Sequence, residues 1–267
     1  MELSLDPSKA ASYSSRSQIA RVVTENWVAE QVYCPACDCK TLVPTPPGTQ
    51  VVDFVCRVCK EGFQLKSQSH AFRSKVTDAA YGPMIERIEQ CRAPSFMFMH
   101  YRPDRWRVRD LFLVPSYFLS PSMIERRKPL ALTARRARWV GCNILLSALP
   151  GDARIPMVAD EIPLASADVR SSWRRFSFFK GANAESRGWM GDVLSCVREL
   201  RLESFSLADV YTFEDHLAAM PPLNKNIRPK IRQQLQVLRD HGVLAFGGRG
   251  RYRVIASEPG PRGQPPL

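Results

Sequence analysis

The sequence predicts a mixed α/β domain followed by a C-terminal winged-helix domain, and three observations support this prediction. Helical and strand-like segments are mixed through the first 180 residues, which is typical of α/β and α+β domains. Residues 186–254 have the patterns of three helices and then a two-stranded hairpin, the element order of a winged helix. The 267-residue chain is 45% hydrophobic and 24% charged, so wholesale disorder and collagen-like structure are excluded.

The N-terminal part contains helices and strands in alternation. Residues 16–32 place apolar side chains at helical intervals, which predicts an amphipathic helix. A block over residues 50–67 alternates like strands, residues 78–91 are predicted to be helical, and residues 96–101 and 110–115 are predicted strands. Residues 128–150 are first basic and then apolar, and their pattern favours no single element.

The C-terminal part has clearer signals for where helices begin and end. Helices are predicted over 186–200, 206–220 and from about 229 to 241. Ser206 and Asp209 form a capping-box pattern, Pro229 suits a first helical turn, and Gly242 ends the third helix. The segments VLAF and RYRVI flank the turn GGRG and predict the hairpin. We therefore predict one domain over 1–180, a winged helix over 181–256 and a disordered tail over 257–267.

The charge distribution favours a polyanionic partner. The chain has 38 Lys and Arg residues against 26 Asp and Glu residues, a net charge of +12. Two segments, 125–138 and 224–254, carry net charges of +5 and +7, so the rest of the chain is balanced. Two separate basic surfaces are therefore expected, and nucleic acid or an anionic membrane would suit them.

Four of the eight cysteines have metal-ligand spacing. Cys34 and Cys37 form one CxxC pair, and Cys56 and Cys59 form a second pair eighteen residues later. Two such pairs brought together across a hairpin supply the four tetrahedral thiolates that Zn²⁺ prefers, so we expect a closed, structural zinc site. Redox-active or buried thiols are the alternative. Cys39 is expected to stand outside the site, and the three remaining cysteines, Cys91, Cys142 and Cys196, are expected to be packing residues.

A possible catalytic set adjoins the second cysteine pair. Asp53, Gln64 and Lys66 form a D-x10-Q-x-K arrangement on two predicted strands, and Gln64 and Lys66 project from the same side of one strand. This arrangement resembles the PD-(D/E)xK nuclease pattern, in which oxygen ligands hold Mg²⁺ at the scissile phosphate and the lysine assists the attacking water. Gln64 departs from that pattern because it replaces an acid, which predicts weaker Mg²⁺ binding. A surface strand with scattered polar residues is the alternative.

Three groups of residues are candidate DNA contacts. The third predicted helix of the winged helix carries Lys230, Arg232, Gln233 and Gln234, which are residue types able to contact base edges. Its wing carries Arg249 and Arg251, which suit phosphates. In RKPLALTARRARWVGCNI, Arg135 and Arg136 precede Trp139, a combination that suits phosphate contact and stacking. A core tryptophan and a protein-docking winged helix are the alternatives.

Longer runs of residues extend this picture to nearly the whole chain. The segments SQIARVVTENWV, YCPAC, VVDFVC, FQLKS, RKPLALTARRARWVGCNI, SRGW, IRQQLQVLRD and GRGRYR, in this order, resemble the DpnI family of restriction endonucleases, which includes the Dam-replacing proteins. The resemblance implies a PD-(D/E)xK catalytic domain, a winged helix, and Mg²⁺-dependent, type II cleavage of duplex DNA at GATC sites carrying N6-methyladenine. It further implies that Asp53, Gln64 and Lys66 are catalytic, that the Leu65 carbonyl is a further Mg²⁺ ligand, and that Trp139 lines a methyl-sensing pocket.

Two other functional classes stay open from the sequence. A catalytically weak or inactive reader of methylated GATC is favoured by Gln64, whereas a protein-binding adaptor is disfavoured by the two basic segments. We expect a monomer in solution and a location in the prokaryotic cytoplasm without membrane attachment, since the first residues lack the apolar core of a signal peptide and no apolar run is long enough to span a membrane.

Overall fold

The computed structural model of the chain describes residues 1–46, 49, 51–219 and 226–255. The chain forms two compact units built from interleaved segments. The first unit comprises residues 1–74, 92–116 and 152–177, and the second comprises residues 75–91, 117–151 and 178–267. The predicted tail at 257–267 lies outside the described residues. The mixed α/β character predicted from the sequence is confirmed.

The first unit is organised around a seven-stranded mixed sheet with the order β1-β2-β3-β5-β6-β9-β10. Only β3 and β5 pair in parallel among these neighbours, and the other pairs are antiparallel. The strands are β1 (Val43–Pro44), β2 (Phe54–Val55), β3 (Gly62–Gln68), β5 (Ser95–Arg102), β6 (Arg107–Val114), β9 (Ile155–Ala159) and β10 (Ile162–Pro163).

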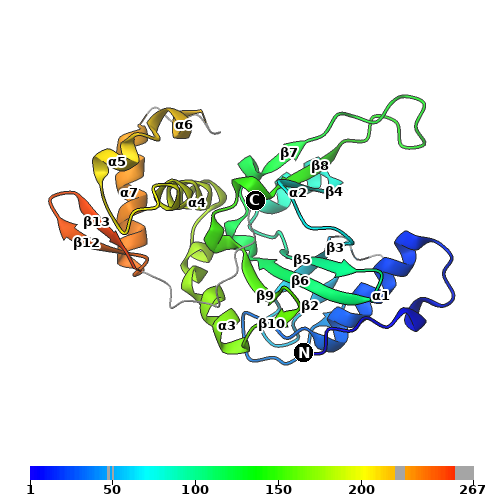
Figure 1. Cartoon of the computed structure of the whole chain (residues 1–267). Helices are drawn as coiled ribbons and strands as arrows, with labels where there is room; N and C mark the ends of the chain where they lie inside the picture. Colours follow the sequence, from blue (N-terminus) through cyan, green and yellow to red (C-terminus); the bar gives the residue numbers. More distant parts are fainter. Residues whose placement is uncertain (47–48, 50, 220–225, 256–267) are drawn as a thin grey trace. The chain divides into compact units, whose positions relative to one another are not determined.

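Helices α1 (Arg16–Gln31) and α3 (Ser166–Arg175) belong to the first unit (Figure 1). The Thr24 hydroxyl of α1 lies 3.0 Å from the Ser67 hydroxyl of β3, and Trp173 of α3 contacts the Phe63 ring of β3 at a centroid distance of 6.0 Å. Phe63 and Ser67 lie on the same face of β3 because side chains alternate along a strand. Gln64 and Lys66 therefore project from the opposite face of the sheet.

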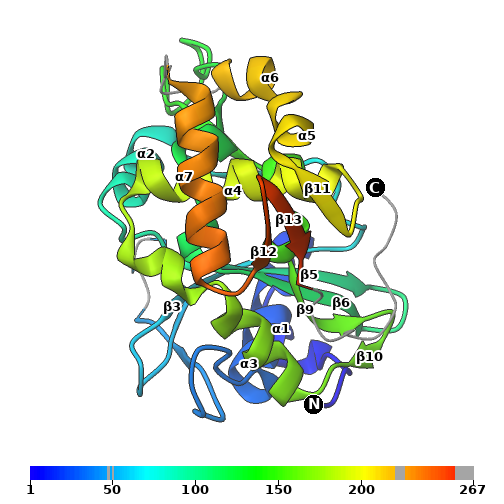
Figure 2. The same cartoon turned by 90° about the vertical axis from the view of Figure 1, so that its left-hand side faces the viewer.

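The second unit contains a small sheet and a winged helix. Antiparallel strands β4 (Lys75–Ala80), β8 (Gly141–Leu145) and β7 (Ile124–Arg126) accompany α2 (Tyr81–Glu89). The winged helix consists of α4 (Ala184–Glu199), β11 (Ser204–Ser206), α5 (Leu207–Tyr211), α6 (Glu214–Ala218), α7 (Ile227–Asp240), β12 (Leu244–Gly248) and β13 (Arg251–Val254). Figure 2 shows α7 crossing α4 with the β12–β13 hairpin beside it. Its sheet has the order β11-β13-β12.

Short 3-10 helices connect these elements. In the described residues they are η1 (Pro7–Ala10), η2 (Ser116–Phe118), η3 (Pro121–Met123), η4 (Leu146–Ala148), η5 (Gly151–Ala153) and η6 (Ser177–Gly181).

Local sequence signals account for the winged helix. The capping box predicted at Ser206 is confirmed, with the Ser206 hydroxyl accepting from the Asp209 backbone and the Asp209 carboxylate accepting from the Ser206 backbone. Ile231, Leu235 and Leu238 of α7 are fully buried, which fixes the inward face of that helix. Gly242 has a φ of +69°, a conformation that glycine adopts without strain, and it ends α7 as predicted.

Several predicted boundaries were wrong. The helix expected over 78–91 starts only at Tyr81, because residues 75–80 pair with β8 as strand β4. The helix expected over 206–220 is two short helices, α5 and α6, and residue 220 lies outside the described part of the chain. The small sheet and α2 belong to the same compact unit as the winged helix.

Candidate metal centre and nucleic-acid interface

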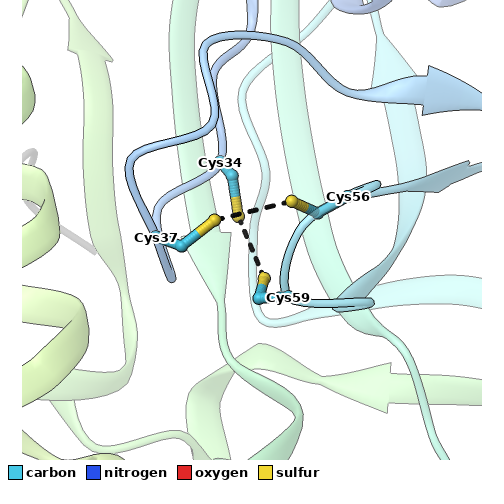
Figure 3. A group of neighbouring side chains, drawn as sticks. All are labelled: Cys34, Cys37, Cys56 and Cys59. Atoms are coloured by element: carbon cyan, nitrogen blue, oxygen red, sulfur yellow. Dashed lines mark hydrogen bonds between the residues drawn. The ribbon is translucent and has the colours of Figure 1, made fainter.

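The four predicted zinc ligands converge on one point. The Sγ atoms of Cys34, Cys37, Cys56 and Cys59 all lie within 4.8 Å of one another, with Cys34 to Cys59 and Cys37 to Cys56 each at 3.6 Å (Figure 3). Sulfur atoms bound tetrahedrally at about 2.3 Å from one Zn²⁺ ion lie about 3.8 Å apart. The cluster therefore fits a closed four-thiolate metal site.

Two turns and one arginine position these thiols. The Cys34 backbone N–H donates to the Cys39 carbonyl, and the Cys56 N–H donates to the Glu61 carbonyl, so each cysteine pair lies in a hydrogen-bonded turn. Arg170 of α3 donates to the Cys34 carbonyl at 3.3 Å, and its guanidinium lies over the Tyr33 ring at 4.9 Å. The first turn is thereby attached to the helix that contacts β3.

Burial affects the acidity of these thiols in the metal-free chain. Desolvation raises the pKa of Cys34 well above its ordinary value and that of Cys59 to about 11. Protonated thiols do not bind metal, so a bound cation has to displace those protons, and its affinity rises with pH.

The other four cysteines stay outside the cluster. Cys39 donates to the Thr41 carbonyl, as expected for a residue outside the site, and Cys142 and Cys196 are buried packing residues. Cys91 differs from the prediction because it is exposed, has a φ of +56° and accepts a hydrogen bond from Arg187 at 3.0 Å. Its surroundings are therefore polar.

Asp53, Gln64 and Lys66 lie on neighbouring strands. β2 pairs with β3 so that Phe54 is opposite Phe63, and Asp53 directly precedes β2. The Asp53 backbone N–H donates to the Phe63 carbonyl at 2.8 Å, and its carboxylate accepts from the Leu65 N–H at 2.8 Å. The structure therefore holds the Asp53 carboxylate at the backbone of Leu65, the residue between Gln64 and Lys66, and these two side chains share one side of β3.

Two acids on the elements that flank this set, Glu61 and Glu25, have partners of their own. Glu61, on the turn before β3, accepts from the Ser95 hydroxyl at 2.7 Å. Glu25 of α1 pairs with Arg21 at 2.8 Å, which raises the Arg21 pKa together with a smaller contribution from the charge of Asp53. Gln64 is 8% exposed.

The winged helix presents a polar face of α7 to solvent. Arg232, Gln233 and Gln236 are exposed and recur at helical spacing, and Lys230 is part-exposed beside them. Tyr211 of α5 accepts a hydrogen bond from the Arg232 guanidinium, which fixes that side chain over the helix. Sequence reasoning missed Gln236 and Tyr211, because only the packing of α7 shows which of its polar residues face outward.

Gln234 does not lie on that face. It is 3% exposed and lines a pocket of about 380 Å³ between α4 and α7, together with Met190 and His241. α7 turns 100° per residue, so the burial of Leu235 and Leu238 carries Gln234 inward as well. The prediction that Gln234 contacts a base edge is therefore contradicted by its burial.

The wing has the expected charges. Arg249, Arg251 and Arg253 are exposed, and Arg249 has a φ of +49° at the tip between Gly248 and Gly250. The tight turn brings Arg249 and Arg251 to one end of the β12–β13 hairpin.

Trp139 lies on the hairpin that connects β7 with β8. Its indole lies against Gly141, where an added Cβ atom would be 2.8 Å from Cη2 and Cζ3 of the ring. The Arg136 guanidinium covers the indole at 5.0 Å from the ring centroid, and Arg135 is exposed beside it. Trp139 is part-exposed. The structure thus places an aromatic face and two cations together, and Gly141 is a required neighbour that the sequence did not indicate.

These features define a class of protein: a chain with a cluster of four cysteines able to hold a metal, an acid, an amide and a lysine on a mixed sheet, and a winged helix with a basic wing. Models of two protein domains match almost the whole of it. The Dam-replacing family (DpnI) matches residues 1–182, and the Dam-replacing HTH domain matches residues 185–254. The chain belongs to the DpnI, or Dam-replacing, family. Membership of this family indicates that the protein is a restriction endonuclease. The helix-turn-helix domain indicates that its binding partner is DNA. Among the described residues no helix has the length and apolar character needed to cross a membrane.

Proposed function

We propose that this protein is a methyl-directed, type II restriction endonuclease that hydrolyses duplex DNA at GATC sites carrying N6-methyladenine, in a Mg²⁺-dependent reaction. One observation carries the catalytic part of the proposal: in a member of the DpnI family, the Asp53 carboxylate accepts a hydrogen bond from the Leu65 N–H, between Gln64 and Lys66 on β3. This arrangement supports a PD-(D/E)xK assignment for the sheet of the first unit.

The donor set fits a hard divalent cation. A carboxylate oxygen of Asp53, the amide oxygen of Gln64 and the carbonyl of Leu65 are the oxygen ligands that Mg²⁺ prefers. When bound, the cation would polarise the scissile phosphate and supply an activated water. The hydrogen bond from the Leu65 N–H fixes the Asp53 carboxylate and links it to β3.

Lys66 has a separate role in this proposal. Its ammonium would orient the attacking water and stabilise the negative charge that develops on the phosphate. Gln64 supplies an oxygen without a charge, so the site has one negative charge fewer than a site with two acids. We therefore expect cleavage that requires a high Mg²⁺ concentration.

Zinc has a structural role in this proposal. Cys56 directly follows β2, and its turn leads through Glu61 into β3, so the cluster closes the hairpin that carries Asp53 and Gln64. A four-thiolate site has no open coordination position for substrate. Zn²⁺ at this position would hold the catalytic hairpin in register without taking part in the chemistry.

DNA recognition is divided between the two basic segments. Arg232, Gln233, Gln236 and Lys230 of α7 would contact base edges, and Arg249 and Arg251 of the wing would contact phosphates. Trp139 would line the pocket that accepts the methyl group, with Arg135 and Arg136 on the adjacent phosphates. We place this activity on a monomer in the prokaryotic cytoplasm.

A plasmid digest tests the catalytic assignment. The parent should cut adenine-methylated plasmid and spare unmethylated plasmid in the presence of Mg²⁺. Asp53→Ala should abolish cutting while retaining the gel shift of methylated duplex, and Lys66→Ala should slow cutting. Asp104→Ala, which removes an exposed aspartate of the same unit, is the matched control and should cut like the parent. Cutting by Asp53→Ala at the parental rate would refute the assignment.

Gln64 favours a second candidate function, a reader of methylated GATC that does not cut. Under this alternative the parent shifts methylated duplex but fails to cut at any Mg²⁺ or Mn²⁺ concentration. Gln64→Glu then tests whether cleavage can be restored. A chain that neither cuts nor shifts methylated duplex would refute both functions.

A further inference from the structure

A leucine occupies the tip of the hairpin between β7 and β8. Leu132 is 74% exposed, which is the largest exposure among the exposed large hydrophobic side chains of the described residues. The Ala134 N–H donates to the Ala131 carbonyl at 3.0 Å, so Leu132 is a central residue of a tight turn. Turns of this kind are normally occupied by Gly, Asn, Asp or Ser. An apolar side chain held out in solvent here suggests that a partner covers it.

The segment that presents Leu132 is an ordered arm. We call residues 127–140 the β7–β8 arm (Figure 1). Its two sides are joined by backbone hydrogen bonds from Arg127 to Gly141, from Leu130 to Trp139 and from Arg138 to Leu130. Pairing therefore continues beyond the ends of β7 and β8 almost to the tip. Leu132 is presented at a defined position by a paired hairpin.

The arm is strongly cationic. It contains five basic residues, and the sequence has no acidic residue between Glu125 and Asp152. All five side chains are exposed: Arg127, Lys128, Arg135, Arg136 and Arg138. An apolar tip between cations matches a partner whose anionic groups flank an apolar slot. In duplex DNA, phosphates flank stacked bases in this way.

We propose that Leu132 is a wedge that inserts between two stacked base pairs of the bound duplex, in or beside the recognised site. The proposal rests on the proposed function for DNA binding and adds how this arm deforms its substrate. Leucine is among the side chains that proteins insert between base steps, and such insertion unstacks the step and kinks the duplex. The surrounding cations would hold the phosphates on either side of the step, and Trp139 would contact the neighbouring base.

The test measures base stacking directly. Short methylated GATC duplexes carry 2-aminopurine at each step in turn, because its fluorescence rises when it unstacks. The full-length protein is added with Ca²⁺ in place of Mg²⁺ so that the duplex stays uncut. We expect the parent to raise the fluorescence at one step. Leu132→Ala should return that signal to the level of free duplex while weakening binding by less than about tenfold, and Leu132→Met should retain it.

Ile162→Ala is the matched control. Ile162 on β10 is also an aliphatic side chain exposed to solvent, at 66%, and its truncation should leave both fluorescence and binding unchanged. Equal melting temperatures of the variants would show that neither substitution disturbs folding.

Several results would overturn the wedge. One is a parent that binds methylated duplex without unstacking any step, and another is a Leu132→Ala variant that keeps the parental signal. If Leu132→Ala loses the fluorescence signal only in proportion to its loss of duplex binding, the arm contributes affinity and does not unstack a base step. If Leu132→Ala lowers the molecular mass of the protein in light scattering but leaves the fluorescence of the duplex unchanged, a second copy of the chain covers Leu132. Failure of the parent to bind methylated duplex would instead refute the proposed function.

Discussion

Replacing Asp192 with asparagine is expected to stabilise the second unit, and the gain should be larger at mildly basic than at mildly acidic pH. Asp192 lies on α4, the first helix of the winged helix. Burial raises the pKa of its carboxyl group from the ordinary value of 3.8 to about 7. Asparagine has nearly the same shape and cannot ionise, so the substitution removes the charge while preserving the packing of α4.

The sign follows from proton binding. Folding raises this pKa, so the folded state holds the proton more tightly than the unfolded chain does. The protonated Asp192 therefore contributes fully to stability below about pH 4, and this contribution is lost as the pH rises to about 7. A difference of about three pKa units at 1.36 kcal/mol each corresponds to about 4 kcal/mol. Asp192 keeps some exposed surface, and access of water reduces this penalty. We therefore expect a gain of roughly 2–4 kcal/mol above pH 7.

Urea unfolding at about pH 5 and about pH 8 measures this effect. The gain in unfolding free energy for Asp192→Asn should be at least about twofold larger at the higher pH, because at pH 5 only the unfolded chain has lost its proton. Asp104→Asn is the control, since a hydrogen bond from Arg102 lowers the Asp104 pKa and its replacement should bring no gain that grows with pH. An equal gain for Asp192→Asn at both pH values, or a loss at pH 8, would refute the reasoning.

Three further predictions concern the proposed sites. Exhaustive chelation of zinc, or Cys56→Ser, should lower the melting temperature and cutting together, because structural metal binding contributes folding free energy; a melting temperature unchanged after full metal loss would exclude a structural role. Gly141→Ala should displace Trp139, since the new Cβ would lie 2.8 Å from the ring. In a gel shift, this variant should prefer methylated over unmethylated duplex less strongly than the parent does. An unchanged preference would show that Trp139 does not recognise the methyl group. Gln64→Glu should lower the Mg²⁺ concentration for half-maximal cutting by about tenfold or more, because the added charge contributes roughly 2 kcal/mol or more; a higher requirement would show that Gln64 is no ligand.

Features with short-range signals could be predicted from the sequence. The two cysteine pairs, the capping box at Ser206 and the stop at Gly242 depend on residues within a few positions of each other, and the structure confirms all three. Helix α1 was predicted correctly for the same reason, because its apolar residues repeat with the period of the helix itself.

Features that depend on distant partners could not be predicted in this way. Residues 75–80 form a strand only because β8, more than sixty residues later, supplies its hydrogen bonds. Gln234 resembles its neighbour Gln233 in the sequence, and only the packing of α7 against α4 buries one and exposes the other.

The candidate catalytic set combines both kinds of information. The sequence by itself determined which residue types occur, including the glutamine at position 64 in place of an acid. The tertiary structure alone decided the pairing of β2 with β3, the hydrogen bond that ties the Asp53 carboxylate to Leu65, and the contacts that engage Glu61 with Ser95 and Glu25 with Arg21. The physical reason is that residue chemistry is local to the chain, whereas register and side-chain pairing depend on strands and helices that meet only after folding.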